Sequence, residues 1–226
     1  MTRVIDRLVL GLWQANCFVL GDRETGRAVV VDPGQHGAAP VAGLLDRLEL
    51  TCEAVLLTHG HLDHLWAAPE LAADLDVPVL LHRDDHWLWE NPAAGFGQSL
   101  ELLEQQFGLS WAPPGERLEE MRDGQRLPFA DLGLLVRHTP GHTPGSCVFV
   151  LDGDAPLLFS GDLLFAGSVG RTDLPRGSWE QQMQSLQRVV VPLPGRTTVH
   201  AGHGQDTTVA AELASNPFLR DLPRSV

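Results

Sequence analysis

Short apolar runs separated by glycine, proline and aspartate predict strands in the first part of the chain. Residues 3–10, 16–22 and 27–34 each contain such a run, with Gly21–Asp22 closing the second and Pro33–Gly34 closing the third. Runs of this length bounded by turn residues are typical of strands that follow one another in a meander.

The middle of the chain changes to an alternating pattern. Apolar residues have helical spacing over 40–50 and 69–76, and continuous apolar runs cover 53–58 and 78–82. Strands that alternate with helices in this way predict β-α-β units.

A second strand-rich part follows a segment, 87–126, whose pattern predicts helix and loop with a break at 112–116. The later pattern predicts strands at 132–138, 146–153, 156–162 and 197–203, and helices at 178–190 and 207–216. We therefore predict a single α/β domain over residues 1–226, in which two α/β halves face each other as a four-layer αββα sandwich.

The charge of the chain excludes several partners. It contains 29 acidic and 16 basic residues, for a formal charge of −13, and the basic residues are scattered. Binding to phosphates rests on clustered Lys and Arg, so we expect no nucleic-acid partner.

Charges interrupt the apolar start of the chain and no run is long enough to cross a bilayer, so we expect no membrane association and a cytoplasmic location. The three cysteines lack C-x-x-C spacing, which predicts free buried thiols.

The segment from Thr58 to Ala67, "THGHLDHLWA", carries the strongest chemical signal. His59, His61, Asp63 and His64 follow a predicted strand, at the end where α/β proteins place their sites. Imidazole and carboxylate are the usual ligands of a borderline divalent cation. His59 and His61 project to one side of an extended chain, whereas the adjacent Asp63 and His64 point differently, which indicates a second metal position. A lone histidine would be interpreted as a surface or capping residue, but this density indicates a site.

Further candidates stand at the ends of later predicted strands. "HTPGHTPGS" contains His138 and His142, "FSGD" contains Asp162, and "HAGHG" contains His200 and His203. Taken alone, a histidine near glycines is more often a turn residue, and an aspartate after a strand is more often a helix cap. Their shared placement at strand ends makes them ligand candidates.

These segments together resemble a known family. "THGHLDH", "TPGHTPGS", "SGDLLF" and "GHG" are similar, in order and spacing, to the ligand motifs of the metallo-β-lactamase fold superfamily. "GSVGRTDLP" and "NPFLRDL" resemble its glyoxalase II-like branch of short, single-domain hydrolases.

The resemblance implies a binuclear metal site with seven ligands and two divalent ions, expected to be zinc, although His/Asp sets also accept iron or manganese. The implied ligands are His59, His61 and His142 for metal 1, Asp63, His64 and His203 for metal 2, and Asp162 as the bridge. It also implies that His138 and His200 are not ligands. Two metals about 3.5–4 Å apart would ionise a shared water near neutral pH, and Asp63 would orient that hydroxide as a catalytic residue.

Three features bear on the substrate. The resemblance implies that Arg171 contacts a carboxylate of the substrate's thiol part, although a salt bridge to Asp173 is an alternative. Trp66 follows the Asp63–His64 pair where small residues are usual, and either packs in the core or narrows the pocket. The chain contains no tyrosine and ends soon after the last motif, so we expect it not to bind glutathione in the manner of glyoxalase II, which uses phenols and a C-terminal helical region.

The resulting hypothesis is a metal-dependent thioesterase of the hydroxyacylglutathione hydrolase (glyoxalase II-like) type, which acts on an acyl thioester of a small thiol through a metal-bound hydroxide. The first alternative is a persulfide dioxygenase with one iron held by His59, His142 and Asp162. A lactonase or β-lactamase is the second. A structural metal module is disfavoured because structural zinc sites are closed and usually rich in cysteine.

Overall fold

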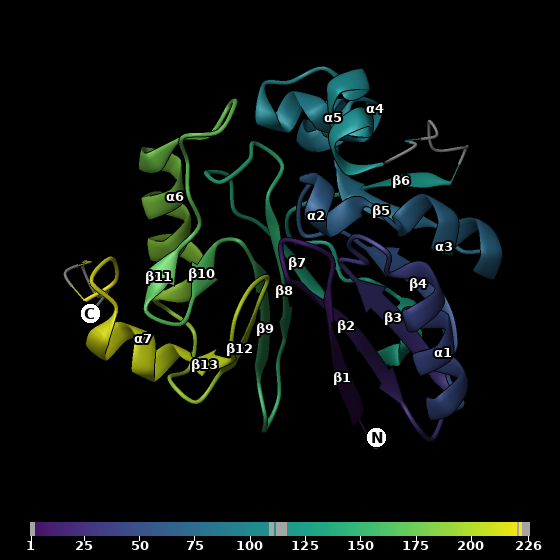
Figure 1. The fold of residues 1–226 in the computed structure, drawn as a ribbon. Coiled ribbons are helices and arrows are strands. Elements are labelled where there is room, and N and C mark those ends of the chain that lie inside the picture. Colours follow the sequence, from purple (N-terminus) through teal and green to yellow (C-terminus); the bar gives the residue numbers. More distant parts are fainter. Residues whose placement is uncertain (1–2, 109–110, 112–116, 221, 223–226) are drawn as a thin grey trace.

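A computed structural model of the chain describes residues 3–108, 111, 117–220 and 222. The predicted break at 112–116 lies outside these residues. Two large sheets face each other at the centre of the molecule, and helices cover their outer faces (Figure 1).

The first sheet has six strands in sequential order. Its first three strands are antiparallel, as the predicted meander requires, and its last four are parallel. The strands are β1 (Arg3–Leu10), β2 (Ala15–Asp22), β3 (Arg27–Val31), β4 (Thr51–Leu56), β5 (Val79–His82) and β6 (Leu118–Met121).

The second sheet has five strands in the order β13-β12-β9-β8-β7, and a short hairpin of β10 and β11 stands beside it. Within this sheet β12 runs parallel to β9 and the other pairs are antiparallel. The strands are β7 (Leu135–His138), β8 (Cys147–Leu151), β9 (Leu157–Gly161), β10 (Leu164–Phe165), β11 (Ser168–Val169), β12 (Thr198–Ala201) and β13 (Thr207–Thr208).

Helices α1 and α3 lie outside the first sheet, and α6 and α7 lie outside the second (Figure 1). The helices are α1 (Ala38–Leu48), α2 (Leu62–Leu65), α3 (Ala68–Leu75), α4 (His86–Glu90), α5 (Leu100–Phe107), α6 (Trp179–Ser185) and α7 (Val209–Ser215). Shorter helical turns are η1 (Arg83–Asp85), η2 (Pro92–Phe96), η3 (Phe129–Asp131) and η4 (Leu186–Val190). None of the helices in this part of the chain is both long and apolar enough to span a bilayer.

Alternating side chains of the strands divide the apolar core into three layers. On β3, Val29 and Val31 face the second sheet while Val30 packs against the helices of the first half. On the second sheet, Phe149 and Phe159 fill the inner layer while Leu158 packs under the outer helices. Successive residues of a strand point to opposite faces, so two sheets with both faces buried give four layers of secondary structure. The predicted αββα sandwich is confirmed.

Two details differ from the sequence pattern. The predicted helix at 178–190 is an α-helix only to Ser185, after which η4 widens into a π turn. Strand β6 lies inside the segment that predicted helix and loop. It pairs only with β5 at the sheet edge and exposes Glu119 and Glu120, so it lacks the apolar run that marks a buried strand.

Candidate metal centre

The loop after β4 is held by Asp32, which follows β3. The Thr58 backbone N–H donates to Asp32 Oδ1 at 2.7 Å, and the Thr58 hydroxyl donates to Oδ2 at 2.6 Å. The same Oδ2 lies 3.0 Å from Nδ1 of His64. A single buried carboxylate thus fixes both ends of the histidine-rich segment.

The structure brings His59, His61 and His142 together as one group of buried imidazoles. Their ring centroids are 4.5–4.9 Å apart, and Nδ1 of His61 lies 2.8 Å from Nε2 of His142. Nδ1 of His142 donates to the Arg171 carbonyl at 2.6 Å. The proton is then on Nδ1, so Nε2 of His142 carries a lone pair that faces the group. Burial, together with repulsion from neighbouring histidines, lowers the pKa of His59 and of His61. Both rings are therefore neutral, the form that binds a metal.

Asp63, His64 and His203 form a second group beside the first. Nε2 of His203 lies 3.2 Å from Asp63 Oδ2 and 3.2 Å from His64 Nε2. Burial alone would lower the pKa of His64, but the Asp63, Asp162 and Asp32 carboxylates outweigh it and raise the pKa to about 10. These carboxylates need a positive charge near them, which a proton or a cation can supply.

Asp162 stands between the two groups. Its Oδ2 lies 3.4 Å from His142 Nε2 in the first group and 3.7 Å from His203 Nε2 in the second, and its Oδ1 lies 3.4 Å from His64 Nε2. A Cβ on Gly202 would overlap Oδ1, so only glycine leaves room for the carboxylate there.

The donor atoms fit a divalent metal. The ligand atoms of His59, His61 and His142 lie within 4.8 Å of one another, as do those of Asp63, His64 and His203. Nε2 of His59 and of His61 and Oδ1 of Asp162 are buried and have no hydrogen-bond partner among the described residues. Buried polar atoms are normally paired, so these three unpaired ligand atoms fit a site that binds a cation.

The remaining candidate histidines lie elsewhere. His138 donates from Nε2 to the Pro144 carbonyl at 2.8 Å and stacks on His82, with ring centroids 4.0 Å apart and 11° between the planes. The ligand atoms of His82, Asp84 and His138 also lie within 4.8 Å of one another, but this group is separate from the seven predicted ligands. His200 stacks on Phe159, with a centroid distance of 5.0 Å.

Two buried side chains that the sequence pattern did not single out connect the ligand loops. Asp85 accepts hydrogen bonds from Gly60 N at 2.9 Å, Thr143 Oγ1 at 2.6 Å and Gly145 N at 2.7 Å, and so joins the loops of His59, His61 and His142. Burial raises the pKa of Asp85, and these three donors oppose the rise.

Gln182 of α6 is the other connecting residue. Its Oε1 accepts from His142 N at 2.9 Å, and its Nε2 donates to the Leu163 carbonyl at 3.1 Å. Asp32 and Asp85 both stand just after a strand, the signal that marked the other candidates. Gln182 lies inside a helix and carries no such signal.

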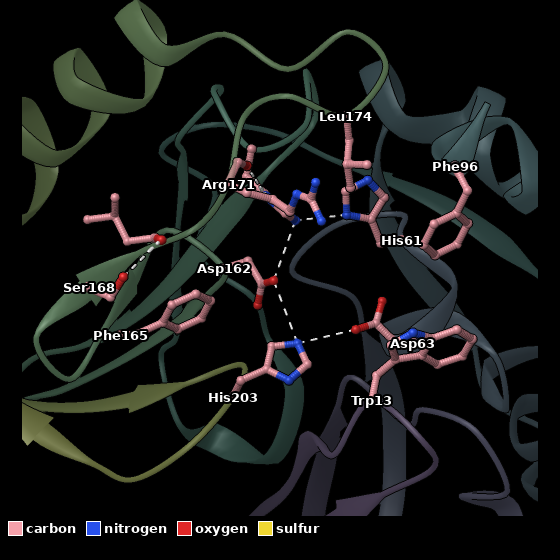
Figure 2. A pocket seen from close by; sticks show the side chains of 12 residues that line it. Trp13, His61, Asp63, Phe96, Asp162, Phe165, Ser168, Arg171, Leu174 and His203 are labelled. Atoms are coloured by element: carbon pink, nitrogen blue, oxygen red, sulfur yellow. Dashed lines mark hydrogen bonds and ion pairs between the residues drawn. The ribbon is translucent and has the colours of Figure 1, made fainter.

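A pocket of about 400 Å³ opens over the two groups (Figure 2). Trp13 and Phe96 lie on the side of His61 and Asp63, and Phe165 lies on the opposite side, next to His203. The pocket is lined by Trp13, His61, Asp63, Phe96, His142, Asp162, Phe165, Ser168, Val169, Arg171, Leu174 and His203.

Two residues with alternative interpretations can now be placed. The Arg171 guanidinium donates to both oxygens of Asp173 at 2.7 Å, so the salt bridge is present in the structure, and both side chains are exposed. Trp66 packs behind Trp13, with ring centroids 6.1 Å apart, and contacts the core of the first half. This placement favours the core interpretation of Trp66.

Comparisons with known proteins agree with the fold and with a metal site of some kind. Residues 10–203 match the family model of the Metallo-beta-lactamase superfamily. The chain is similar to the hydroxyacylglutathione hydrolase GloC of Haemophilus influenzae, at 34% identity over 95% of this chain and 97% of GloC. It is also similar to TTHA1623, solved in a di-iron-bound form, at 38% identity with a TM-score of 0.80, covering 95% of this chain and 100% of that one.

A third similarity is to the crystal structure of BLEG-1 B3 metallo-beta-lactamase, at 36% identity and a TM-score of 0.81, covering 96% of this chain and 99% of that one. The four layers, the two His/Asp groups at the ends of the strands and the family match lead to one conclusion: the chain is a metallo-hydrolase of the metallo-β-lactamase superfamily.

Proposed function

We propose that this chain is a single-domain thioester hydrolase of the glyoxalase II-like type, with two divalent metals, expected to be zinc. The observation that carries the proposal is the position of Asp162 between two groups of three donors on the floor of one pocket. In this assignment His59, His61 and His142 bind metal 1, Asp63, His64 and His203 bind metal 2, and Asp162 bridges them. The similarity to GloC, named a hydroxyacylglutathione hydrolase, supports the choice of a thioester.

Two cations at this point would lower the pKa of a shared water and stabilise negative charge on a carbonyl oxygen. The residues of the chain hold the metal ligands in position. The Arg171 carbonyl fixes the ring of His142 through its 2.6 Å hydrogen bond, and Asp32 fixes that of His64. Such partners set the tautomer and the direction of each ligand.

Asp63 has a second role in this proposal. Its carboxylate lines the pocket and faces His203, and the histidines around it lower its pKa below the ordinary value, against the effect of burial. It therefore remains an acceptor that can orient the attacking water. The leaving thiolate has a conjugate acid with a pKa of about 8.5, so it departs without a dedicated general acid.

The decisive experiment combines metal analysis with two assays on one preparation purified without added metal. Two equivalents of zinc and cleavage of an acyl thioester above the metal-free control are expected. One equivalent of iron, with oxygen uptake that depends on a persulfide and no thioester cleavage, would replace the hydrolase with the dioxygenase.

Two further outcomes are distinguished in the same preparation. Two equivalents of iron with thioester cleavage would retain the hydrolase and change only the metal, which the di-iron form of the similar TTHA1623 makes a specific alternative. A chromogenic β-lactam tests the activity named for BLEG-1. Turnover of the β-lactam without thioester cleavage would contradict the proposal.

A further inference from the structure

Four aromatic rings from four segments form a wall on one side of the pocket. Trp13 stands in the turn between β1 and β2 and stacks on Phe96 of η2, with centroids 6.0 Å apart and 17° between planes. Phe107 of α5 and Trp66 contact the same indole at 5.1 and 6.1 Å. The wall is thus built from side chains that are distant in sequence and fixed by one another.

The turn that carries Trp13 is itself anchored. Gln35 Oε1 accepts a hydrogen bond from the Leu12 backbone N–H at 2.8 Å, and the Gln35 side chain packs against Gly11, where a Cβ would lie 2.5 Å from it. Gln35 is 2% exposed. The indole is therefore held in place before any ligand arrives, which reduces the entropy lost on binding.

Trp13 and Phe96 are shared by two hollows. They line the pocket of about 400 Å³ over the metal ligands and also a neighbouring hollow of about 130 Å³, whose other lining residues are Gln98, Leu103, Gln106 and Phe107. An apolar cavity of about 150 Å³ accommodates benzene. The second hollow thus has the size of one phenyl ring and lies next to the reaction centre.

The charges near the pocket favour a neutral group at this wall. None of the six residues lining the second hollow is charged. Of the residues lining the larger pocket, Arg171 is the only arginine, and it is paired with Asp173. A group that packs against the Trp13 and Phe96 rings gains most from being uncharged and apolar.

We propose that the Trp13–Phe96 wall binds an apolar substituent of the substrate, about the size of a phenyl ring, and so selects aryl-bearing or similarly bulky thioesters over small ones. This inference rests on the proposed thioester hydrolysis. The substituent belongs either to the acyl group or to the thiol, since both share the same apolar chemistry.

The test uses four thioesters made from two acyl groups, acetyl and phenylacetyl, and two thiols, 2-mercaptoethanol and benzyl mercaptan. In the wild-type enzyme one phenyl-bearing partner should raise kcat/KM by about 10- to 100-fold over its small counterpart, mainly through KM. If the preference follows the acyl group, the wall binds the acyl end of the substrate, and if it follows the thiol, the wall binds the thiol end.

Trp13→Ala should abolish the preference: kcat/KM for the phenyl-bearing thioester should fall about 10- to 100-fold more than kcat/KM for the small thioester. Trp179→Ala is the matched control, since Trp179 is 48% exposed on α6 and contacts Phe218. Trp13→Leu keeps an apolar side chain, in case the alanine variant does not fold, and should lose most of the preference. Equal kcat/KM for phenyl and methyl partners in the wild type, or an equal loss in Trp179→Ala, would overturn the inference and leave the hydrolase standing.

Binding separates this inference from the proposed function. Thioether analogues that carry benzyl or methyl groups and cannot be hydrolysed are titrated into metal-loaded protein by calorimetry. The benzyl analogue should bind at least tenfold more tightly, with the difference lost in Trp13→Ala, even if no thioester is cleaved. Equal affinity for the two analogues would refute the wall as a binding site, whatever the reaction.

Discussion

At the scale of single residues, side-chain orientation separates the proposed metal donors from histidines that stand in a similar sequence context. His142 has Nε2 directed at the group of His59 and His61, whereas His138 is bonded to a carbonyl and stacked on His82. Both histidines occur in the same "HTPGHTPGS" segment. Their orientation, and not their spacing alone, distinguishes a ligand from a neighbour.

We therefore expect His142→Ala to lose one equivalent of metal and nearly all activity, because a first ligand contributes more than the roughly 10–100-fold of an outer partner. His138→Ala should retain both equivalents. Metal content of the purified proteins, measured by mass spectrometry, checks this expectation. Full metal retention in His142→Ala would remove His142 from the ligand set.

Arg171 remains a predicted substrate contact, and its carbonyl also orients His142. Arg171→Ala keeps the carbonyl and removes the guanidinium. If the guanidinium holds a carboxylate of the thiol, KM should rise and kcat/KM should fall by roughly ten- to a hundredfold for a carboxylated thioester, with a neutral thioester nearly unchanged. Asp173→Asn is the control, since it breaks the same salt bridge and retains the positive charge. Similar losses with both substrates in both variants would show that the pair only orders the loop.

At the scale of elements, buried polar side chains connect loops that the sequence pattern treats as independent. Asp85 binds Gly60 in the loop after β4 and Thr143 and Gly145 in the loop before β8. A Cβ on Gly145 would lie 2.6 Å from the Asp85 carboxyl carbon, so glycine is required for this approach. One carboxylate thus sets the distance between the two loops.

Asp85→Asn is expected to weaken metal 1 by about 10–100-fold while metal 2 changes little, because an amide can accept but cannot serve all three donors as a carboxylate does. Competition with a chelator measures both affinities. Asp84→Asn, one residue away and facing solvent, is the control. An equal loss at both metals would indicate general unfolding of the loops instead of local misplacement.

The stacked His82–His138 pair joins β5 of the first sheet to β7 of the second. Burial, and then repulsion from His138, lowers the pKa of His82 from its ordinary value of 6.5 to about 4, although Asp84 opposes the shift. Between these pH values the unfolded chain binds the proton more readily than the folded chain. The stabilisation from a neutral His82 is complete above pH 6.5 and is lost as pH falls toward 4.

We expect the unfolding temperature to decrease as the pH is lowered from 6.5 to about 4. In His82→Gln this decrease should be less steep. His138→Gln should also flatten the dependence, by a smaller amount, because it removes the repulsion and leaves the burial. Unfolding followed by circular dichroism at several pH values tests both variants. Parallel curves for wild type and His82→Gln would contradict the assignment.

The elements show how far sequence patterns reach. Apolar periodicity located β1 to β5, β7 to β9 and the helices that cover them, because buried faces require runs that a sequence displays. It missed β6, because Glu119 and Glu120 of this strand face solvent. It also missed Gln182, a polar residue of α6 whose side chain is buried. It also missed the Trp13–Phe96 wall, since contacts between distant rings leave no local period. Asp32 and Asp85 could have been found by applying the strand-end rule throughout.

At the scale of the whole molecule, the donors are divided between the halves. Of the proposed donors, His59 and His61 lie in the loop after β4 of the first sheet and Asp63 and His64 lie on the short helix α2 that follows it, whereas His142, Asp162 and His203 come from loops of the second sheet. Each metal group thus takes residues from both sheets. Ions held by these groups would link the two halves, which also meet through the inner apolar layer of Phe149 and Phe159.

Removing the metals should therefore lower the unfolding temperature of the whole chain in one transition. A ligand that binds only the folded state at 100 times its Kd contributes about 2.7 kcal/mol, which corresponds to roughly 5–10 °C for a chain of this size. Calorimetry with and without chelator measures the shift, and His142→Ala should show a smaller one. Two separate transitions after chelation would mean that the halves unfold independently.

The division of the donors between two consecutive stretches of chain has a consequence for biosynthesis. All strands of the first sheet lie before residue 122, and all those of the second lie after residue 134. During translation the first half, with four of the seven donors, is complete well before the second. Neither metal group is complete at that stage, because His142 and His203 are still missing. The full set of proposed donors exists only after His203 has left the ribosome, so metal loading at both positions has to follow the synthesis of the second sheet.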